Sequence, residues 1–354
     1  MVAEKIFDSN GKEPMLIDVY FSGGASSVID MIEKDPNYGK NYNIRFAFTN
    51  DEDASGIEKL IGEEITVIIR DHKKEYAKMH EQILDFNDSF DSNSYVKDWG
   101  DFETEDGRES FLKNACGRFY NNTLKDSLRE HLREEYDRIV YESINSENMI
   151  KRYGSPNLVC LSGYMRILSD YFVDTSVPII NVHPAKLSIL TDGKETIDAS
   201  ALSEEEIKNQ LGEDYHRLLT GDDAVTDAIK KRHKTLHSTI HIVDKTVDGG
   251  PILVTSPQVK IDLDNAEEMG LEQYADEVQD IMKDKCDSPA YFKALELIFT
   301  SKVSIDTESG KVLIDSDLTK YGGFLMDDIR WKIVKEYDEN TENFRLKAAP
   351  DDDF

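Results

Sequence analysis

The sequence predicts an α/β fold with a largely parallel central sheet, and three apolar runs carry this prediction. Residues 16–21 are an apolar run, followed by a small-residue turn and an amphipathic helix from Val28, as in a strand–turn–helix unit. Residues 178–183 and 239–243 are two further apolar runs, and polar residues follow or close each of them. Because ligands bind beyond the carboxyl ends of strands in open α/β sheets, we expect these polar residues to share one site.

The polar residues at these two strand ends are Asn181, His183 and Asp248, and together they support acyl transfer. An Asn amide and a protonated His both donate hydrogen bonds, so they can stabilise the oxyanion of a tetrahedral intermediate. A nearby Asp carboxylate favours the charged form of the His and can accept a proton from the attacking nucleophile. The glycines and proline at 249–251 predict a sharp turn after Asp248. A purely structural interpretation stays open, since D-G-G is also a common hairpin turn.

Four short motifs follow one another in the chain. They are G-Y-M-R-I-L, N-V-H-P, H-S-T-I-H and D-G-G-P, at residues 163–168, 181–184, 237–241 and 248–251. In this order they resemble the folate-dependent formyltransferases, and most of all those that act on glycinamide ribonucleotide. The resemblance covers most of residues 16–315, with two interruptions. It implies a Rossmann-like formyltransferase fold that ends in a C-terminal helix and a β-hairpin.

The resemblance implies transfer of a formyl group from the co-substrate 10-formyltetrahydrofolate to the primary amine of glycinamide ribonucleotide in purine synthesis, without a metal. Asn181 and His183 would stabilise the oxyanion, while Asp248 would keep His183 charged and accept the proton. His237 would either support the site or be an ordinary buried histidine. The implied folate-binding residues, whose apolar members could equally be core, are Met165, Arg166, Ile167, Leu168, Asp244 and Val247.

The loop after the first predicted strand consists of small residues, and its amides at the helix start could bind a phosphate. Its residues are Gly23, Gly24, Ala25, Ser26 and Ser27. The resemblance implies that the acceptor phosphate sits here, although the family's loop carries two asparagines that this chain lacks. It also implies an acceptor contact from Asp287, with Lys283 or Lys285 near the phosphate.

Residues 1–330 are predicted to form one formyltransferase domain, with insertions at about 77–150 and 191–219. In the first insertion, residues 127–144 predict a long helix on the outer face of the sheet. The second insertion follows the N-V-H-P motif, and it either changes the acceptor pocket or is a surface loop without effect on it. Residues 331–354 are predicted to be an acidic tail, with a short helix or strand before a frayed end.

Three other functions stay open at this point. The altered loops would suit another amine, such as an amino sugar on a nucleotide carrier. The same three side chains could instead activate water, which would give a formyltetrahydrofolate hydrolase. The third is a binding protein without turnover, although such a protein has no physical need for Asn181, His183 and Asp248 together.

The composition predicts a soluble, cytoplasmic protein that binds small molecules rather than nucleic acid or membrane, and it leaves the oligomeric state open. A formal net charge of −29 would repel phosphate backbones. No apolar run approaches the roughly 20 residues that span a bilayer, and the first residues lack a signal-peptide core. Cys116, Cys160 and Cys286 lack the spacing of metal ligands and suit a reducing compartment.

The acidic excess also predicts adaptation to a high-salt cytosol, where screening offsets the repulsion among like charges. We therefore expect the melting temperature to rise between low salt and molar KCl. Calorimetric scans at both salt concentrations measure this change. A melting temperature that fails to rise would contradict the prediction.

Overall fold

A computed structural model describes residues 3–8, 13–76, 78, 126–306, 311–338 and 343–351. The strands of its largest sheet are β2 (Met15–Phe21), β3 (Tyr42–Thr49), β4 (Val67–Ile69), β5 (Leu158–Leu161), β6 (Ile179–His183), β11 (Thr239–Ile242), β12 (Ile252–Thr255) and β17 (Phe324–Leu325). Their order is β17-β12-β11-β6-β5-β2-β3-β4. Strands β6 to β4 in this order are mutually parallel, whereas β11 is antiparallel to β6 and β12. The predicted largely parallel sheet is confirmed.

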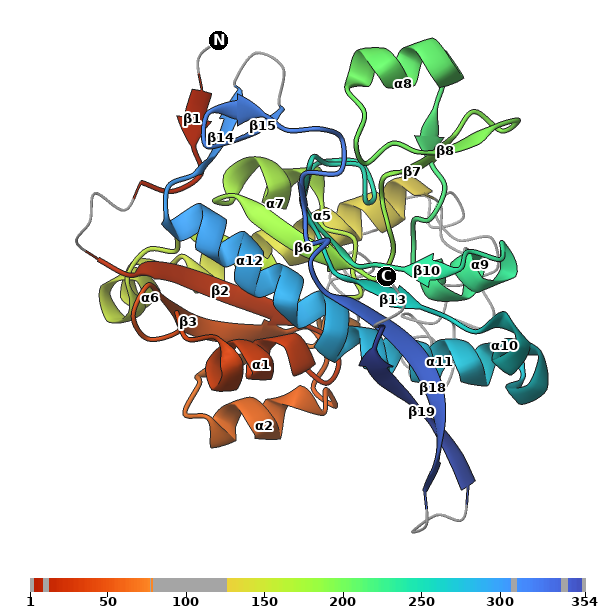
Figure 1. Cartoon of the computed structure of the whole chain (residues 1–354). Helices are drawn as coiled ribbons and strands as arrows, with labels where there is room; N and C mark the ends of the chain where they lie inside the picture. Colours follow the sequence, from red (N-terminus) through yellow and green to blue (C-terminus); the bar gives the residue numbers. More distant parts are fainter. Residues whose placement is uncertain are drawn as a thin grey trace, which may run out of the picture.

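The direction in which the chain builds the sheet changes at β2 (Figure 1). From β2 the chain adds β3 and β4 on one side, and it then returns to add β5 and β6 on the other. Ser22 joins the three strand ends at this point. Its amide donates to Gly163 O at 3.0 Å, its hydroxyl donates to Asn50 Oδ1 at 2.6 Å, and that hydroxyl accepts from the Met165 amide at 2.9 Å. Such a switch point is where open α/β sheets bind ligands.

Helices cover both faces of the sheet because side chains of β2 alternate between two cores. Ile17, Val19 and Phe21 belong to one core cluster, and Tyr20 belongs to the other. The first face carries α1 (Ser26–Lys34), α2 (Gly56–Gly62) and α12 (Ser288–Phe299), and the second carries α5 (Asp126–Ile144), α6 (Glu147–Tyr153) and α7 (Asp170–Thr175). Figure 1 shows α12 crossing in front of β2, with α5 and α7 behind the sheet.

The long helix predicted at 127–144 is α5, and its side chains Leu132, Tyr136 and Val140 pack onto the sheet. This prediction is confirmed. The preceding part of the first insertion, including Cys116, lies outside the described residues. Cys160 and Cys286 are buried free thiols.

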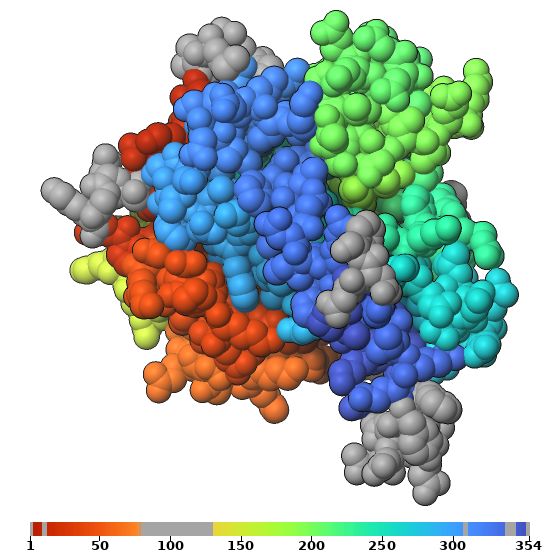
Figure 2. All heavy atoms as spheres, viewed as in Figure 1, coloured from red at the N-terminus to blue at the C-terminus, as the bar shows by residue number. Residues whose placement is uncertain are grey.

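The second insertion folds into a small unit with its own core. It contains β7 (Ile189–Thr191), β8 (Thr196–Asp198), α8 (Glu204–Leu211) and β9 (His216–Arg217), and the strand order is β8-β7-β9. A capping box of Ser203 and Glu206 begins α8. Leu190, Ala199 and Ile207 are fully buried within the unit. In Figure 2 this unit, in green, lies against the blue atoms of the chain that follows α12.

Two further sheets complete the fold. One has the order β1-β14-β15-β16, with β1 (Ala3–Lys5), β14 (Val303–Asp306), β15 (Val312–Ile314) and β16 (Asp317–Leu318). Helix α12 and the hairpin of β14 and β15 that follows it correspond to the C-terminal helix and hairpin that the resemblance implies. The other has the order β10-β13-β18-β19, with β10 (Thr235–Leu236), β13 (Gln258–Lys260), β18 (Arg330–Asp338) and β19 (Asn343–Pro350).

Within the predicted acidic tail, residues 331–338 and 343–350 form strands of this last sheet, where the sequence predicts a short helix or strand before a frayed end. Strands β18 and β19 form an antiparallel hairpin, and β18 pairs in parallel with β13. The hairpin is held because Ile333 and Leu346 are buried in a core cluster with Tyr274 and Val278. That cluster also involves α9 (Ala224–Lys230), α10 (Leu263–Met269), α11 (Leu271–Met282) and the π-helix Lys283–Asp287.

No helix among the described residues is long and apolar enough to cross a membrane.

A buried ion pair ties β2 to β3 on the second face. Arg45 Nε and Nη2 donate to the two carboxylate oxygens of Asp18 at 2.7 and 2.6 Å, and the two side chains are 0% and 1% exposed. Arg45 Nη1 also donates to Gly154 O at 2.7 Å. Burial raises the pKa of Asp18 to about 6, although Arg45 opposes the rise. Arg45 therefore holds a carboxylate that the interior disfavours.

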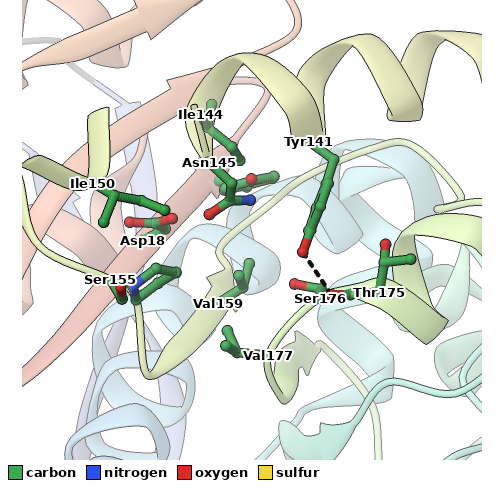
Figure 3. A pocket seen from close by; sticks show the side chains of 12 residues that line it. Asp18, Tyr141, Ile144, Asn145, Ile150, Ser155, Val159, Thr175, Ser176 and Val177 are labelled. Atoms are coloured by element: carbon green, nitrogen blue, oxygen red, sulfur yellow. Dashed lines mark hydrogen bonds between the residues drawn. The ribbon is translucent and has the colours of Figure 1, made fainter. Parts of the chain in front are cut away.

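Asp18 lines a pocket of about 310 Å³ between the sheet and the end of α5 (Figure 3). Ser155 and Pro156 precede β5 and Val177 precedes β6, so the pocket lies at the amino ends of these strands. The Tyr141 hydroxyl donates to Thr175 O at its rim, at 2.8 Å. The pocket is thus at the opposite edge of the sheet from Ser22 and the strand switch point.

Replacing Arg45 by Met should destabilise the protein by about 3–5 kcal/mol, because Asp18 would stay buried without a partner. Urea unfolding followed by circular dichroism measures the change. The control is Lys34→Met, since Lys34 is 50% exposed and pairs with Asp30 and Asp284 at the surface. That change should cost about 1 kcal/mol or less. Equal costs for the two variants would contradict a stabilising role of the buried pair.

Candidate functional site

The pairing of β6 with β11 brings the predicted polar residues together. Asn181 lies directly opposite His241 in this antiparallel pair, so their side chains share one face. Asn181 Nδ2 is 3.2 Å from His241 Nε2. His183 Nδ1 is 3.4 Å from Asp248 Oδ2, and His241 Nε2 is 3.7 Å from Asp248 Oδ1. Asp248 therefore lies between two imidazoles, with Asn181 beside the second.

His241 belongs to this cluster, whereas His237, which the sequence favours as the supporting histidine, does not contact it. His237 Nδ1 lies 3.1 Å from Ser256 O, and burial lowers its pKa to about 4. His237 lies between β10 and β11, which belong to different sheets, so strand alternation does not relate it to His241. The sequence signal for His241 is the H-S-T-I-H motif, but only the register against β6 distinguishes its two histidines.

Burial favours the neutral form of both imidazoles of the cluster. It lowers the pKa of His183, and this effect outweighs the opposing charge of Asp248. It lowers the pKa of His241 to about 4. Burial and Asp248 therefore act on His183 in opposite directions, and a charged His183 stays a prediction.

The surroundings of the two imidazoles differ, because both ring nitrogens of His183 face oxygens whereas His241 Nε2 faces the Asn181 amide. His183 Nε2 donates to Leu219 O at 2.8 Å. His241 Nδ1 donates to Ile242 O at 3.2 Å, so His241 Nε2 accepts from the Asn181 amide. One amide hydrogen of Asn181 remains for another acceptor. Among the described residues, no group of three or more His, Cys, Asp or Glu side chains could hold a metal ion.

The turn after β11 presents the Asp248 carboxylate, as the glycines and proline predict. Asp248 adopts a left-handed backbone with φ 51°, which is uncommon for a residue with a Cβ. A Cβ at Gly249 would lie 1.8 Å from Thr246 Oγ1, and one at Gly250 would lie 1.8 Å from Ile242 O. Both glycines are therefore required for this turn. The Gly221 amide donates to Asp248 Oδ2 at 2.9 Å.

The two segments expected to bind folate expose apolar side chains. In the second segment, Lys245 Nζ pairs with Asp174 of α7 at 2.7 Å. Met165, Ile167 and Val247 are 60%, 53% and 55% exposed, so they are not helix-start core. Leu168 is partly buried against the core of the second face. Asp244 Oδ1 accepts from the Thr246 amide at 2.9 Å and so shapes its own loop.

Arg166 departs from the expected folate site, because its side chain is buried on the α5 side. Its Nη1 donates to Tyr76 Oη at 2.7 Å, and its Nη2 is 3.6 Å from Asp137 Oδ1. Its guanidinium carbon also lies 4.1 Å from the centre of the Tyr136 ring. Only the backbone of Arg166 is therefore available beside Met165 and Ile167.

The predicted phosphate loop at 23–27 leads into α1, which begins at Ser26, two residues before the predicted Val28. Ala25 makes the turn with φ 52°, and no side chain caps this end of α1. The loop packs closely on α2, since the Gly56 amide donates to Gly23 O at 3.0 Å. A Cβ at Gly56 would lie 2.9 Å from that same oxygen.

The residues expected near the acceptor are engaged elsewhere. Asp287 is buried and accepts from the Ser238 hydroxyl at 2.5 Å, and burial raises its pKa to about 6. Lys283 pairs with Asp280 and Lys285 with Asp284, each at 2.6 Å. The contacts of these three residues do not join them to the cluster around Asp248.

No known protein-family profile matches the sequence, and no curated protein matches it. Among solved structures, the chain is similar to phosphoribosylglycinamide formyltransferase from Coxiella burnetii, with a TM-score of 0.51 and 17% identity over 88% of this chain and 99% of that one. It is also similar to phosphoribosylglycinamide formyltransferase from Anaplasma phagocytophilum, at a TM-score of 0.48 and 17% identity over 89% of this chain and 100% of that one. Glycinamide ribonucleotide transformylase 1 from Symbiobacterium toebii follows at 0.45 and 16%, over 85% and 94%. The chain therefore has the Rossmann-like α/β fold of the formyltransferases.

Proposed function

We propose that this protein transfers the formyl group of 10-formyltetrahydrofolate to the primary amine of glycinamide ribonucleotide. The observation that carries the proposal is the cluster of Asn181, His183, His241 and Asp248 at the carboxyl end of β6. The Coxiella burnetii protein with this fold is a phosphoribosylglycinamide formyltransferase. Its fold agrees with the four motifs in the sequence, and the chemistry below rests on the residues of this chain.

The amide of Asn181 suits the developing oxyanion. When the amine nitrogen attacks the formyl carbon, the carbonyl π electrons move onto the oxygen. Asn181 donates one hydrogen to His241, and its second hydrogen is available to that oxygen. Because His241 is itself oriented by Ile242 O, the Asn181 amide is held in place before the reaction.

His183 and Asp248 suit the proton transfer. Neutral His183 and Asp248 lie 3.4 Å apart, so the pair can take one proton from the attacking amine. The proton then rests between a carboxylate and an imidazolium that stabilise each other. Collapse of the tetrahedral intermediate breaks the bond from the formyl carbon to N10 of the folate, and the pair returns the proton to that nitrogen. His183 Nε2 donates to Leu219 O, so it can donate to the oxyanion only after that bond breaks.

The donor side of the site is supported by the exposed apolar side chains. Met165 and Ile167 follow β5, and Val247 directly precedes Asp248. Large apolar side chains left exposed to water are typical of a surface that covers a ligand. A planar pterin would remove them from water, with the backbone of residues 165–168 and 244–248 available for hydrogen bonds.

The acceptor side is supported by the loop at 23–27. Its small side chains and the uncapped start of α1 leave backbone amides available to a phosphate. The loop lies at the strand switch point, where Ser22 contacts the ends of β3 and β5. A ribonucleotide phosphate bound there would direct the amine toward Asp248.

Purified protein in molar KCl should release tetrahydrofolate from 10-formyltetrahydrofolate only when glycinamide ribonucleotide is present. The absorbance of the folate product measures this. Release without an acceptor would instead establish a hydrolase. Folate binding without release under both conditions would exclude glycinamide ribonucleotide and direct the test to nucleotide-linked amino sugars.

Replacing Asp248 by Asn should lower kcat by about 10²–10⁴, the usual contribution of a positioned general base. The KM for the folate should change little, because Asp248 acts on the amine proton. The control is Asp276→Asn, which removes an exposed carboxylate from α11 and should leave kcat unchanged. Strong residual turnover of the Asp248 variant would remove Asp248 from the mechanism.

The pH dependence should reflect the lowered pKa of His183. Its neutral form is needed to share the amine proton, and burial keeps it neutral below its ordinary pKa of 6.5. We therefore expect kcat/KM to hold at pH 6.5 and to fall only at lower pH. Steady-state rates at constant ionic strength measure the profile, and an acidic limb centred above 6.5 would contradict this prediction.

A further inference from the structure

The second insertion returns to the candidate site through a short segment, residues 217–221, which we call the strap. Arg217 begins it in β9, and Gly221 ends it just before α9. Three of its residues contact the polar cluster or the turn that carries it. Leu219 O accepts from His183 Nε2 at 2.8 Å, and the Gly221 amide donates to Asp248 Oδ2 at 2.9 Å. Arg217 makes the third contact.

Arg217 donates hydrogen bonds from its planar guanidinium to the backbone of the D-G-G turn. Its Nη1 donates to Asp248 O, and its Nη2 donates to Gly250 O at 2.8 Å. Its Nε donates to Tyr321 Oη at 3.2 Å, and its guanidinium carbon lies 5.5 Å from the centre of that ring. Two carbonyls, a hydroxyl and a ring thus fix the guanidinium, in a geometry that a lysine ammonium does not reproduce.

The turn needs such support from outside. Asp248 is left-handed, a backbone conformation that costs on the order of 1 kcal/mol or more in a residue with a side chain. The two residues that follow are glycines, and glycine has more backbone freedom than any other residue type. Within the turn, the Gly249 amide donates to Thr246 O at 3.1 Å. Arg217 adds bonds on either side of Gly249 and so restrains both glycines.

The position of Arg217 depends on the inserted unit. Arg217 pairs with Leu190 of β7, and Leu190 is fully buried in the core of the unit. Tyr321 belongs to the same cluster, and its amide donates to Leu202 O at 3.0 Å. The guanidinium is therefore anchored to a folded unit rather than to a loop.

We propose that Arg217 is a positioning residue for Asp248, supplied by the insertion as part of the active site. It holds the carboxylate where His183 and the Gly221 amide meet it. This inference rests on the proposed function, because Asp248 is the proton acceptor there. It assigns the insertion a role in turnover that a surface unit would not have.

The first test compares Arg217→Met and Arg217→Lys with the unchanged protein in the formyl-transfer assay. Both variants should lower kcat by about 10-fold to 10²-fold, because a misplaced catalytic group costs that much, while the KM for the folate stays unchanged. Arg217→Lys keeps the charge and guards against a Met variant that fails to fold. The matched control is Arg138→Met, which removes a half-exposed arginine from α5 and should leave kcat unaltered.

The second test separates positioning from general stability. In the Asp248→Asn background, Arg217→Met should lower kcat by no more than about twofold, because the effects of residues that act as one unit are not additive. Melting temperatures of all variants are measured alongside. If Arg217→Met lowers kcat by the same factor in both backgrounds, the proposal is overturned. An unchanged kcat in the single variants would also overturn it.

The third test does not use activity and therefore distinguishes failure of this inference from failure of the proposed function. Asp248, Asp222 and Arg217 act on His183, and Asp248, Arg217 and His183 act on His241. Because Arg217→Lys keeps the positive charge but should displace Asp248, imidazole titration by nuclear magnetic resonance should show both histidines at lower pKa in that variant. A crystal structure of Arg217→Lys should show the bond from Gly221 to Asp248 lost. If these changes occur in a protein without formyl transfer, the positioning holds and the proposed function fails; unchanged titrations and an intact bond would overturn the positioning itself.

Discussion

The antiparallel register of β11 against β6 is the constraint on which the candidate site depends. It places His241 opposite Asn181, and the turn that follows β11 brings Asp248 Oδ1 within 3.7 Å of His241 Nε2. All the other strands on this side of β2 up to β6 are parallel, so β11 is the first whose amino end meets the carboxyl ends of its neighbours. A slip of one residue would move His241 to the other face of the sheet.

The polar groups of the site are local features of the sequence, and this is why Asn181, His183 and Asp248 could be predicted. Each lies in or after an apolar run, and the two glycines after Asp248 predict the turn. The sequence predicted His237 and not His241 as the supporting histidine, because the break between two sheets that separates them is not visible in the motif. The burial of Arg166 also escaped prediction, since its partner Asp137 comes from a helix far away in the sequence. The hairpin of β18 and β19 depends on packing against α11, which no local pattern records.

The electrostatics of the site show the same division between local and distant causes. Sequence alone places a carboxylate near an imidazole, and that pair alone would raise the pKa of the histidine. The fold adds burial and the positive charge of Arg217, and together they lower it. Under the proposed function, a neutral imidazole can accept a proton, and His183 would then gain its charge during the reaction.

The two sides of the site draw on different parts of the chain. Under the proposed function, the donor side is formed by Met165 and Ile167 after β5 and by Val247 in the loop after β11. The segment after the inserted unit contacts the polar cluster through Leu219 and Gly221. Under the proposed function, the insertion could therefore alter the acceptor without disturbing the folate. Arg217 bears on both sides of the site, because it donates to the turn that carries Val247 and the proposed proton acceptor, Asp248.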